Sequence, residues 1–560
     1  MDAIQADATI DEISCRDMAS ALRGLADALG LPLVMIPTDP VALRPLLVDF
    51  PAARANLSPG RWRNIRSLVQ RALAHVGLTT VPGRSKQKLP PVWDALLVGV
   101  ANDGDRYKLG RFGRYCALAG TEPGAVDDAV LIGYLDDLRA RSIAAEPERI
   151  HRDVIQAWNR CRSVDPAWAA NNLLVPDNRD VYSLPWDRFP ASLKVDVDAW
   201  LDHLAGTDPL AERDFKPLNS ASLHTRKRQI HLFVSAIALS GKDPNDLRTL
   251  ADIVALDNVA AGLRFFWERA GKTRSVHAGQ IAGVLKSVAR HWVKVSPEQQ
   301  ARLASMARQI TPDVGGMTKR NRDLLRPLQD PARMRALLGL PRAVAADVLR
   351  AGPPTHNLAL QIQTAVAIEL LIMAPMRIKN LAALRFGTHL LRDHRRGLTL
   401  VLEEHEVKNG MPLEVPLPAT TVELVERYVA DYLPILSGGQ SDHLFPGRTG
   451  VIAKSLDGLR TQIANCVLTH CGLKMHPHLF RHVAAMIILE QNPGAYGQAQ
   501  RVLAHKNINT TISHYCGMEG PAAFRHYDAL VTKLRDEPAP MATRLMRKTR
   551  KLNPVRDGRR

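Results

Sequence analysis

The chain of 560 residues has few cysteines, no long apolar run and a deficit of acidic side chains. Its six cysteines lack the regular spacing of a disulfide framework, which favours a reducing compartment. The best apolar stretch, residues 364–376, contains a glutamate and is shorter than the roughly 18 apolar residues that cross a membrane. Residues 1–13 are acidic and lack the basic-then-apolar order of a secretion signal. We therefore expect a cytoplasmic protein with no membrane partner.

The shortage of acidic residues leaves the chain strongly basic. It has 74 Lys and Arg against 56 Asp and Glu, a net charge of +18. This excess favours a polyanionic partner such as nucleic acid, and a basic enzyme with no specific anionic partner is the alternative. The 46% of hydrophobic and 23% of charged residues are typical of soluble globular protein. At about 150 residues a domain, the length predicts three or four domains.

Helical periodicity is found in most of the first 340 residues. Apolar residues recur at helical spacing in two series of segments, which a Pro- and Asp-rich stretch separates. The segments are 61–77, 106–120, 126–142 and 148–163, and then 192–206, 222–241, 259–271 and 275–295. Each series predicts a short helical bundle, and the pair favours a degenerate duplication. We predict an N-terminal helical domain (1–165), a linker (166–190) and a second helical domain (191–312).

The rest of the chain has a different composition. Residues 313–345 contain Gly, Pro and Arg and predict a basic connector. They precede a predicted mixed α/β domain over residues 346–535, with a buried helix at 357–376 and a small sheet with an Asn-Gly hairpin turn at 397–418. The tail, 536–560, is basic and is expected to be disordered until it meets a partner. The predicted fold class is therefore mainly α with a small β-sheet.

A cluster of histidines and an arginine, His-Pro-His-Leu-Phe-Arg-His at residues 476–482, precedes an apolar run. His478 and Arg481 are three residues apart, so a helix places both on one face, where both can address one phosphate. Cutting a DNA strand without metal requires such groups, because guanidiniums and imidazoles stabilise charge on the non-bridging oxygens. It also requires a nucleophile and a proton donor for the leaving oxygen, roles that a tyrosine and a lysine can fill.

Further candidates follow one another along the last third of the chain: Arg377 after the buried helix, Lys408 at the predicted hairpin turn, and then His505 and Tyr515. Each has a plain structural alternative, namely a surface ion pair, a solvated turn lysine, a helix-end histidine and core packing. If Tyr515 were a core residue, the nucleophile would be Tyr527 or Tyr496.

This ordered set resembles the tyrosine recombinase (phage integrase) family. The matching stretches are 376–386, 407–418, 478–486 and 503–517. The resemblance implies one role for each candidate. Tyr515 attacks and forms a 3′-phosphotyrosyl link, Lys408 protonates the departing 5′-hydroxyl, and His478 assists proton handling and phosphate binding. The non-bridging oxygens are held by Arg377, Arg481 and His505.

The resemblance also implies site-specific DNA recombination or integration, in the setting of a mobile genetic element, without metal, ATP or cofactor. It implies a partner of double-stranded DNA, a homotetramer in the synaptic complex, with or without partner recombinases, and a core-binding fold for residues 191–312 and, less directly, for 1–165. Two other functions stay open: a non-catalytic DNA-binding protein on the same fold, and relaxation of DNA in the manner of a type IB topoisomerase.

The sequence departs from the family pattern at three places. Asn380 stands where many members have an acidic residue, and Pro375-Met376 replaces a common Gly-Leu. His505 and Tyr515 are ten positions apart where nine is commoner, which puts His514 at the usual tyrosine position. These departures concern the efficiency of the reaction more than the identity of the family.

Two further groups of residues have a weaker pattern. The cysteines and histidines of residues 466–478 could ligate a soft metal, but their spacing matches no usual zinc site, so no metal is expected. Basic residues begin two helices of the second helical domain, where they would suit phosphate contacts with duplex DNA or be merely solvated. These candidate DNA-binding residues are Arg226, Lys227, Arg228, Lys272 and Arg274.

Overall fold

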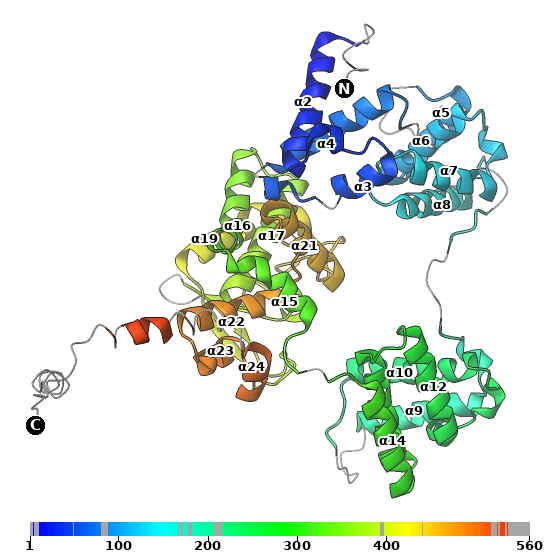
Figure 1. Cartoon of the computed structure of the whole chain (residues 1–560), viewed down its shortest axis with the longest axis vertical. Coiled ribbons are helices and arrows are strands. Elements are labelled where there is room, and N and C mark those ends of the chain that lie inside the picture. The colour runs from blue at the N-terminus through cyan, green and yellow to red at the C-terminus, as the bar shows by residue number, and fades with distance from the viewer. Residues whose placement is uncertain are drawn as a thin grey trace, which may run out of the picture. The chain divides into compact units, whose positions relative to one another are not determined.

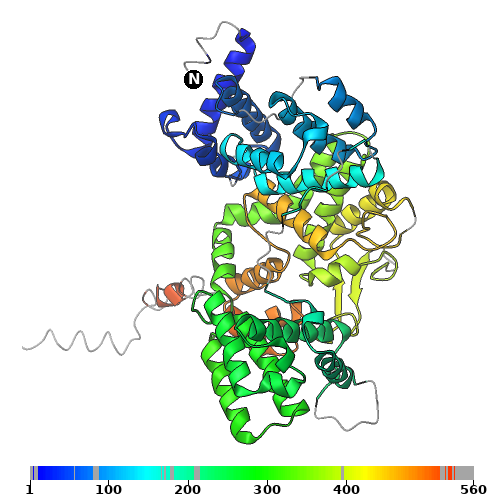
Figure 2. The same cartoon turned by 90° about the vertical axis from the view of Figure 1, so that its right-hand side faces the viewer.

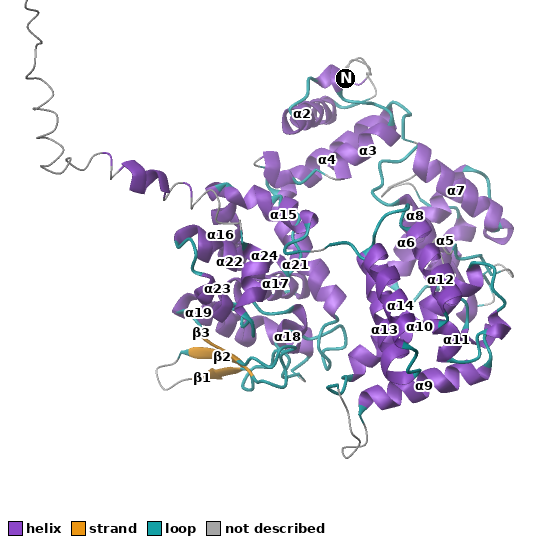
Figure 3. Cartoon of the chain, turned by 60° about the horizontal axis from the view of Figure 1, so that its bottom comes forward, coloured by secondary structure: helices purple, strands orange, loops and turns teal. Residues whose placement is uncertain are grey.

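The computed structural model divides the chain into two compact units, Met1–Val175 with Gly316–Arg560, and Pro176–Gly315 (Figure 1). The described residues are 4, 10–48, 50–55, 57–79, 88–165, 167–168, 172–176, 182–206, 215–313, 315–392, 397–439, 441–516, 524, 527–532 and 535. The predicted basic tail, 536–560, and part of the predicted linker, 166–190, lie outside them. The predicted fold class, mainly α with a small β-sheet, is confirmed by the elements described below (Figure 3).

The Pro176–Gly315 unit is a helical bundle, drawn in shades of green in Figure 2. Side chains at the N-caps fix where its helices begin: Asn219, Ser275 and Ser296 each accept a hydrogen bond from a backbone N–H in the first turn. Trp200 and Phe233 are fully buried at the centre of its core. The helices are α9 (Ala191–Ala205), α10 (Ser220–Leu239), α11 (Leu250–Val254), α12 (Leu256–Arg269), α13 (Val276–Ser287) and α14 (Pro297–Ile310).

The helices before residue 166 pack around two hydrophobic clusters. One is built from α2 (Glu12–Leu29), α3 (Pro40–Val48) and α4 (Pro59–His75), and contains Leu25, Leu47 and Val69. The other contains Trp93, Phe112 and Trp158, whose rings lie edge to face at centroid distances near 6.2 Å. Its helices are α5 (Pro91–Val98), α6 (Asp103–Leu118), α7 (Asp128–Ala140) and α8 (Pro147–Val164). The predicted N-terminal domain thus contains two packed groups of helices.

Residues 117–126 and 238–247 form closely similar turns. Both read Ala-Leu-x-Gly-x-x-Pro-x-x followed by an apolar residue, and both follow the end of a long helix. The glycines, Gly120 and Gly241, have φ values of 68° and 94°, a region that favours glycine. Each turn then forms a short 3₁₀ helix and ends on a buried side chain, Val126 or Leu247. The shared turn supports a duplication of the helical bundle.

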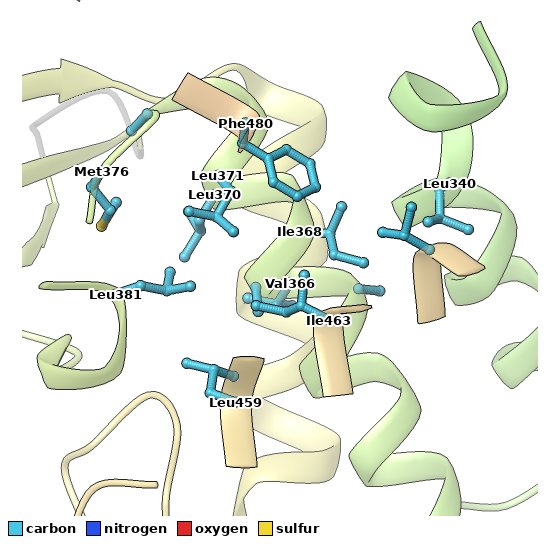
Figure 4. Close-up of a cluster of buried hydrophobic side chains, with 14 of the residues drawn as sticks. Leu340, Val366, Ile368, Leu370, Leu371, Met376, Leu381, Leu459, Ile463 and Phe480 are labelled. Atoms are coloured by element: carbon cyan, nitrogen blue, oxygen red, sulfur yellow. The ribbon is translucent and has the colours of Figure 1, made fainter. Parts of the chain in front are cut away.

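The core of the last third is built around α17 (His356–Met373), whose residues are buried on almost every side. Figure 4 shows Val366, Ile368, Leu370 and Leu371 of this helix against side chains of its neighbours, among them Phe480. By length and composition α17 could cross a membrane, but 61% of that window is buried inside the protein, as a core helix requires. The neighbours are α16 (Pro331–Arg350), α18 (Ile378–Ala383), α19 (Ala419–Arg427), α20 (Leu433–Ser437), α21 (Leu456–Cys471), α22 (Leu479–Gln491), α23 (Tyr496–Val502) and α24 (Ile508–Tyr515).

The prediction of a connector over residues 313–345 is wrong for most of that segment, which is helical. Residues 319–345 form α15 (Lys319–Leu325), a 3₁₀ turn (Arg326–Gln329) and the first part of α16. Leu325, Leu328 and Leu337 are buried in the same core as α17. The arginines and prolines of this segment suggested a linker, but its leucines recur at helical spacing and contribute to the core.

The three strands form one antiparallel sheet in the order β1 (Leu390–Arg392), β2 (Leu398–Leu402) and β3 (Leu413–Pro416). Alternate residues of β2 are buried, and Leu400 pairs with Val415 across the hairpin. The connection between β2 and β3 is longer than the predicted two-residue Asn-Gly turn and covers residues 403–412. The Glu406 carboxylate accepts hydrogen bonds from the Glu403 N–H at 2.9 Å and from His389 Nε2 at 2.7 Å, which folds the chain there into a broad loop.

Glycines test the helix packing of the Pro176–Gly315 unit. A Cβ at Gly262 of α12 would lie 2.5 Å from Cε2 of buried Phe233, so we expect Gly262→Ala to destabilise the unit by about 1–3 kcal/mol through overpacking. The matched control is Gly283→Ala in α13, where a Cβ would meet nothing within 4 Å. Because alanine loses less backbone entropy than glycine on folding, this variant should gain about 0.5–1 kcal/mol of stability. Denaturant unfolding of both variants measures the two changes, and equal changes would contradict the close packing of α10 and α12.

Candidate active site

Arg481 is the most deeply held of the predicted site residues. It lies in the first turn of α22 and is 4% exposed. Its Nη1 donates to the Pro375 carbonyl at 2.5 Å and its Nη2 to the Leu503 carbonyl at 2.6 Å. Burial lowers the pKa of Arg481 to about 10, with a further contribution from the charge of Arg377, and the guanidinium stays protonated at neutral pH. The two carbonyls fix its orientation.

Arg377 is the N-cap residue of α18 and approaches Arg481 from the end of α17. Its Nη1 donates to Oδ1 of Asn409 at 3.2 Å, and Nδ2 of Asn409 donates to the Ala504 carbonyl. Burial lowers the pKa of Arg377. One amide side chain therefore ties the first arginine to the β2–β3 loop and to the turn before His505.

The turn at residues 503–505 has an unusual backbone. Ala504 has a φ of 47°, the left-handed region that side chains with a Cβ disfavour. Its carbonyl and that of Leu503 accept the bonds from Asn409 and Arg481. His505 follows, and its Nδ1 lies 2.9 Å from Oγ1 of Thr511 in α24. Burial first, and then the charges of the two arginines, lower the pKa of His505 to about 4, so this imidazole is neutral at pH 7.

Tyr515 is the last residue of α24 and is 2% exposed. Its ring is nearly parallel to that of His505, with centroids 6.4 Å apart, and meets the ring of His482 edge to face at 5.4 Å. Burial raises the pKa of Tyr515 to about 12, and the charge of Arg481 opposes that rise. The phenol is therefore protonated in the DNA-free protein and lies beside imidazoles and a guanidinium.

The two alternative tyrosines lie in different surroundings. Tyr527 is 62% exposed, in a helical stretch after α24. Tyr496 begins α23 and is partly buried against the hydrophobic core. Tyr515 is the tyrosine with ring contacts to His482, His505 and His514.

His478 lies at the entrance to the cluster, immediately before α22. The residue as a whole is exposed, and its ring centroid is 5.2 Å from that of His482. Desolvation lowers the pKa of His478 to about 4, followed by the charges of Arg481, His476 and Arg377. Because the residue is exposed, water screens those charges more strongly here than at buried His482.

Lys408 is the predicted site residue that the fold does not bury with the others. It is exposed in the β2–β3 loop, and its neighbour Asn409 makes the contact to Arg377. The remaining five residues, Arg377, His478, Arg481, His505 and Tyr515, approach one another through the contacts and charges described above. Among the residues that the structure describes, no group of three or more His, Cys, Asp or Glu side chains could hold a metal ion.

Three residues of the cluster were not among the predicted set: Asn409, His482 and Ala504. Asn409 and His482 each directly follow a predicted residue, so their position in the motif was a usable signal. Nothing in the side-chain pattern identified Ala504, whose role depends on its backbone angle.

The candidate DNA-binding residues lie in the Pro176–Gly315 unit. Two of them form ion pairs, Lys227 with Asp198 at 2.5 Å and Arg274 with Asp313 at 3.7 Å. Arg226 donates to Gln229 at 3.3 Å. Arg228 and Lys272 are exposed.

The backbone of Ala504 gives a test of the turn. Because glycine adopts a φ of 47° without steric cost, we expect Ala504→Gly to stabilise the protein by about 0.5–1 kcal/mol, and Ala504→Val to destabilise it by at least about 1 kcal/mol. Thermal or denaturant unfolding measures both. In the matched control, Ala346→Gly at an exposed position inside α16, the same replacement should destabilise by about 0.5–1 kcal/mol. A loss of stability in Ala504→Gly as large as in the control would contradict the left-handed turn.

Known proteins resemble the part of the chain that contains this cluster. Residues 353–519 match the family model described as phage integrase family. The tyrosine recombinase XerC of Xanthomonas campestris pv. campestris (strain B100) is 30% identical over 175 residues, which are 31% of this chain and 50% of that protein. XerC of Xanthomonas axonopodis pv. citri (strain 306) is 28% identical over 203 residues, 36% of this chain and 62% of the relative. The chain thus spans about half the length of the curated relatives it matches.

Solved structures resemble it more loosely. The Tn1549 transposon integrase in complex with transposon right end DNA is 13% identical, covers 60% of this chain and 99% of its own, and gives a TM-score of 0.36. A superposition this loose supports no conclusion about the arrangement of the chain. The family match rests on sequence, over the segment that contains Arg377, Arg481 and Tyr515. Over residues 353–519 the chain is thus similar to the tyrosine recombinase (phage integrase) family.

Proposed function

We propose that this protein is a site-specific recombinase that cuts and rejoins DNA strands through a covalent link to Tyr515. The observation that carries the proposal is the surroundings of that phenol. A buried tyrosine lies against two imidazoles and within the field of a fixed guanidinium, in a domain of the tyrosine recombinase family. Buried core tyrosines do not require such neighbours, whereas an attack on a phosphodiester does.

The proposed reaction uses the groups as the fold arranges them. Arg377, Arg481 and His505 hold the non-bridging oxygens of one phosphodiester. The Tyr515 oxygen attacks phosphorus, the bond from phosphorus to the 5′-oxygen breaks, and a 3′-phosphotyrosyl link forms. The phenolic proton passes to His478, which is neutral at pH 7 because its pKa is lowered. A 5′-hydroxyl of another strand can reverse these steps, since the link conserves the phosphodiester energy.

Lys408 is proposed as the general acid that protonates the leaving 5′-oxygen. Its side chain is exposed on the 403–412 loop. Asn409 already ties this loop to Arg377, so a small movement of the loop on DNA binding would bring the ammonium to the phosphate. A long, flexible amine suits such a step.

The partners follow from the chemistry. We propose a double-stranded DNA recombination site as substrate, a homotetramer that synapses two sites, with or without partner recombinases, and a role in a mobile genetic element in the cytoplasm. The helical domains, 191–312 and 1–165, are proposed to clamp the duplex together with the mixed α/β domain over 346–535. The basic helix starts of 191–312 would face phosphates. The net charge of +18 supports a polyanionic partner.

The nucleophile can be tested even while the DNA target sequence is unidentified. We expect the full-length protein, incubated with a randomised library of nicked duplex DNA, to form a covalent adduct that survives detergent. After nuclease digestion, mass spectrometry should find the nucleotide on the peptide containing Tyr515. Tyr515→Phe should abolish the adduct, because phenylalanine keeps the ring packing and removes the nucleophile.

The matched controls are Tyr527→Phe and Tyr496→Phe, which should keep the adduct. An adduct that persists in Tyr515→Phe would exclude this nucleophile. DNA binding without any adduct would indicate a non-catalytic DNA-binding protein. Relaxation of supercoiled plasmid with no recombinant product would indicate a type IB topoisomerase.

The role of Lys408 can be tested with a changed leaving group. On the DNA sequence recovered from the adduct, Lys408→Ala should slow adduct formation by about 100-fold or more, because the 5′-oxygen leaves without a proton. A 5′-bridging phosphorothiolate should restore the rate, since a thiol has a pKa of about 8.5 and its thiolate leaves without a proton. Lys474→Ala, at another exposed lysine, is the control and should behave as wild type with both substrates. An equal defect of Lys408→Ala on both substrates would exclude a general acid.

A further inference from the structure

The segment from Gly316 to Asn321 lies directly against the helix that carries Tyr515. Gly316 has a φ of 71°, and a Cβ placed there would lie 2.3 Å from the carbonyl oxygen of Ser513 in α24. No side chain fits in that space, since the atom it would meet belongs to the backbone. The next residue, Met317, is buried in the same hydrophobic core as Tyr515. The chain therefore touches the tyrosine helix backbone to backbone, two residues before Tyr515.

The same segment also reaches Tyr515 through a side chain. Thr318 caps α15 by accepting a hydrogen bond from the Asn321 N–H at 3.2 Å, which fixes the first turn. The amide Nδ2 of Asn321 lies 3.4 Å from Nε2 of His482. His482 is 2% exposed, and its ring meets the ring of Tyr515 edge to face at 5.4 Å.

His482 is well suited to support the ring of Tyr515. Burial, and then the charges of His478 and the other cationic groups, lower its pKa to about 3, so the ring is neutral throughout the physiological range. With Asn321 as donor, Nε2 is the acceptor and Nδ1 holds the proton. Among the described residues that Nδ1 is buried with no hydrogen-bond partner, a cost that a surface histidine would avoid.

We propose that residues Gly316–Asn321 form a support for the nucleophile, which we call the seat. In it, the backbone contact of Gly316 fixes the position of α24, and Asn321 holds His482 against the Tyr515 ring. Gly316, Asn321 and His482 are thus positioning residues, which act through Tyr515 and do not touch the phosphate. This inference rests on the proposed function for its consequence in catalysis, but the seat itself is a property of the DNA-free fold.

The seat lies at a boundary between the two units in the sequence. The residues before Gly316 belong to the Pro176–Gly315 unit, so the seat begins where the chain leaves that unit. A change in the backbone at this junction reaches Ser513 with no side chain in between. The contact with α24 thus lies at the first residue after the Pro176–Gly315 unit.

Hydrogen exchange of the full-length protein without DNA tests the seat directly. We expect Gly316→Ala and Asn321→Ala to speed exchange of the amides of α24 by about tenfold, because both remove support from a locally stable helix. Amides of α17 serve as the internal reference and should not change. The matched controls are Gly315→Ala, where a Cβ would meet nothing within 4 Å, and Asp323→Ala at an exposed position of α15. Unchanged α24 exchange in Asn321→Ala and in any folded Gly316→Ala would overturn the proposal.

Adduct formation separates the seat from the proposed function. If Tyr515 is the nucleophile, misplacing it by about 1 Å should slow the adduct by on the order of 100-fold in the seat variants and not in the controls. His482→Gln, which keeps an acceptor for Asn321, should lose less than His482→Ala. If the wild-type protein forms no adduct but α24 exchange still responds to Asn321→Ala, the proposed function is excluded and the seat is retained. Normal adduct rates with fast α24 exchange would end the positioning role.

Discussion

The site depends on the burial of one guanidinium between two backbone carbonyls. Arg481 donates to Pro375, 106 residues earlier in the chain, and to Leu503, 22 residues later. Burial of a cation without hydrogen-bond partners costs several kcal/mol of folding free energy. The burial of Arg481 therefore depends on the two carbonyls that accept its hydrogen bonds. The contact joins the end of α17, the first turn of α22 and the turn after α23. Arg377, His478 and His505 project from these three places.

The charge balance of the site follows from that contact. Burial first, and then the charges of the two arginines and of other histidines, lower the pKa of His478 and of His505, and among the described residues no carboxylate is one of the main causes. The site is thus a partly buried region of positive charge, which a bound anion would neutralise. Such an anion would also raise the pKa of the histidines, since it favours their charged form. In the proposed reaction the imidazoles would then become better proton acceptors when the phosphate binds, which is the step at which the phenol loses its proton.

The residues of the site that could be predicted from sequence are those whose chemistry is in their side chains. His478 and Arg481 share a helical face, and Tyr515 follows His505 in the order that the family resemblance implies. The supporting contacts could not be predicted, because they end on backbone atoms that no side-chain pattern encodes. Asn409 binds the Ala504 carbonyl, and the importance of Ala504 depends on a φ value.

The same limit applies to the fold. Helical periodicity predicted the bundles and the buried helix α17, and the alternation of apolar residues predicted the hairpin. The hairpin loop was wrong in length because Glu406 bonds to His389, a contact between distant residues. Residues 313–345 were interpreted as a connector because they contain glycine, proline and arginine. Leu325, Leu328 and Leu337 outweigh them, since burial of a few leucines decides whether a segment joins a core.

The helix that carries Tyr515 is too short to hold its own position. It has eight residues, and only Thr511 and Tyr515 are buried. Helices of this length are marginal by themselves, so α24 takes its place from what touches it. At its start the left-handed turn at Ala504 places His505, which contacts Thr511. Near its end Gly316 packs closely against the backbone of Ser513. Two backbone positions with positive φ thus lie on either side of Tyr515, the proposed nucleophile, and its position depends on these contacts more than on the helix itself.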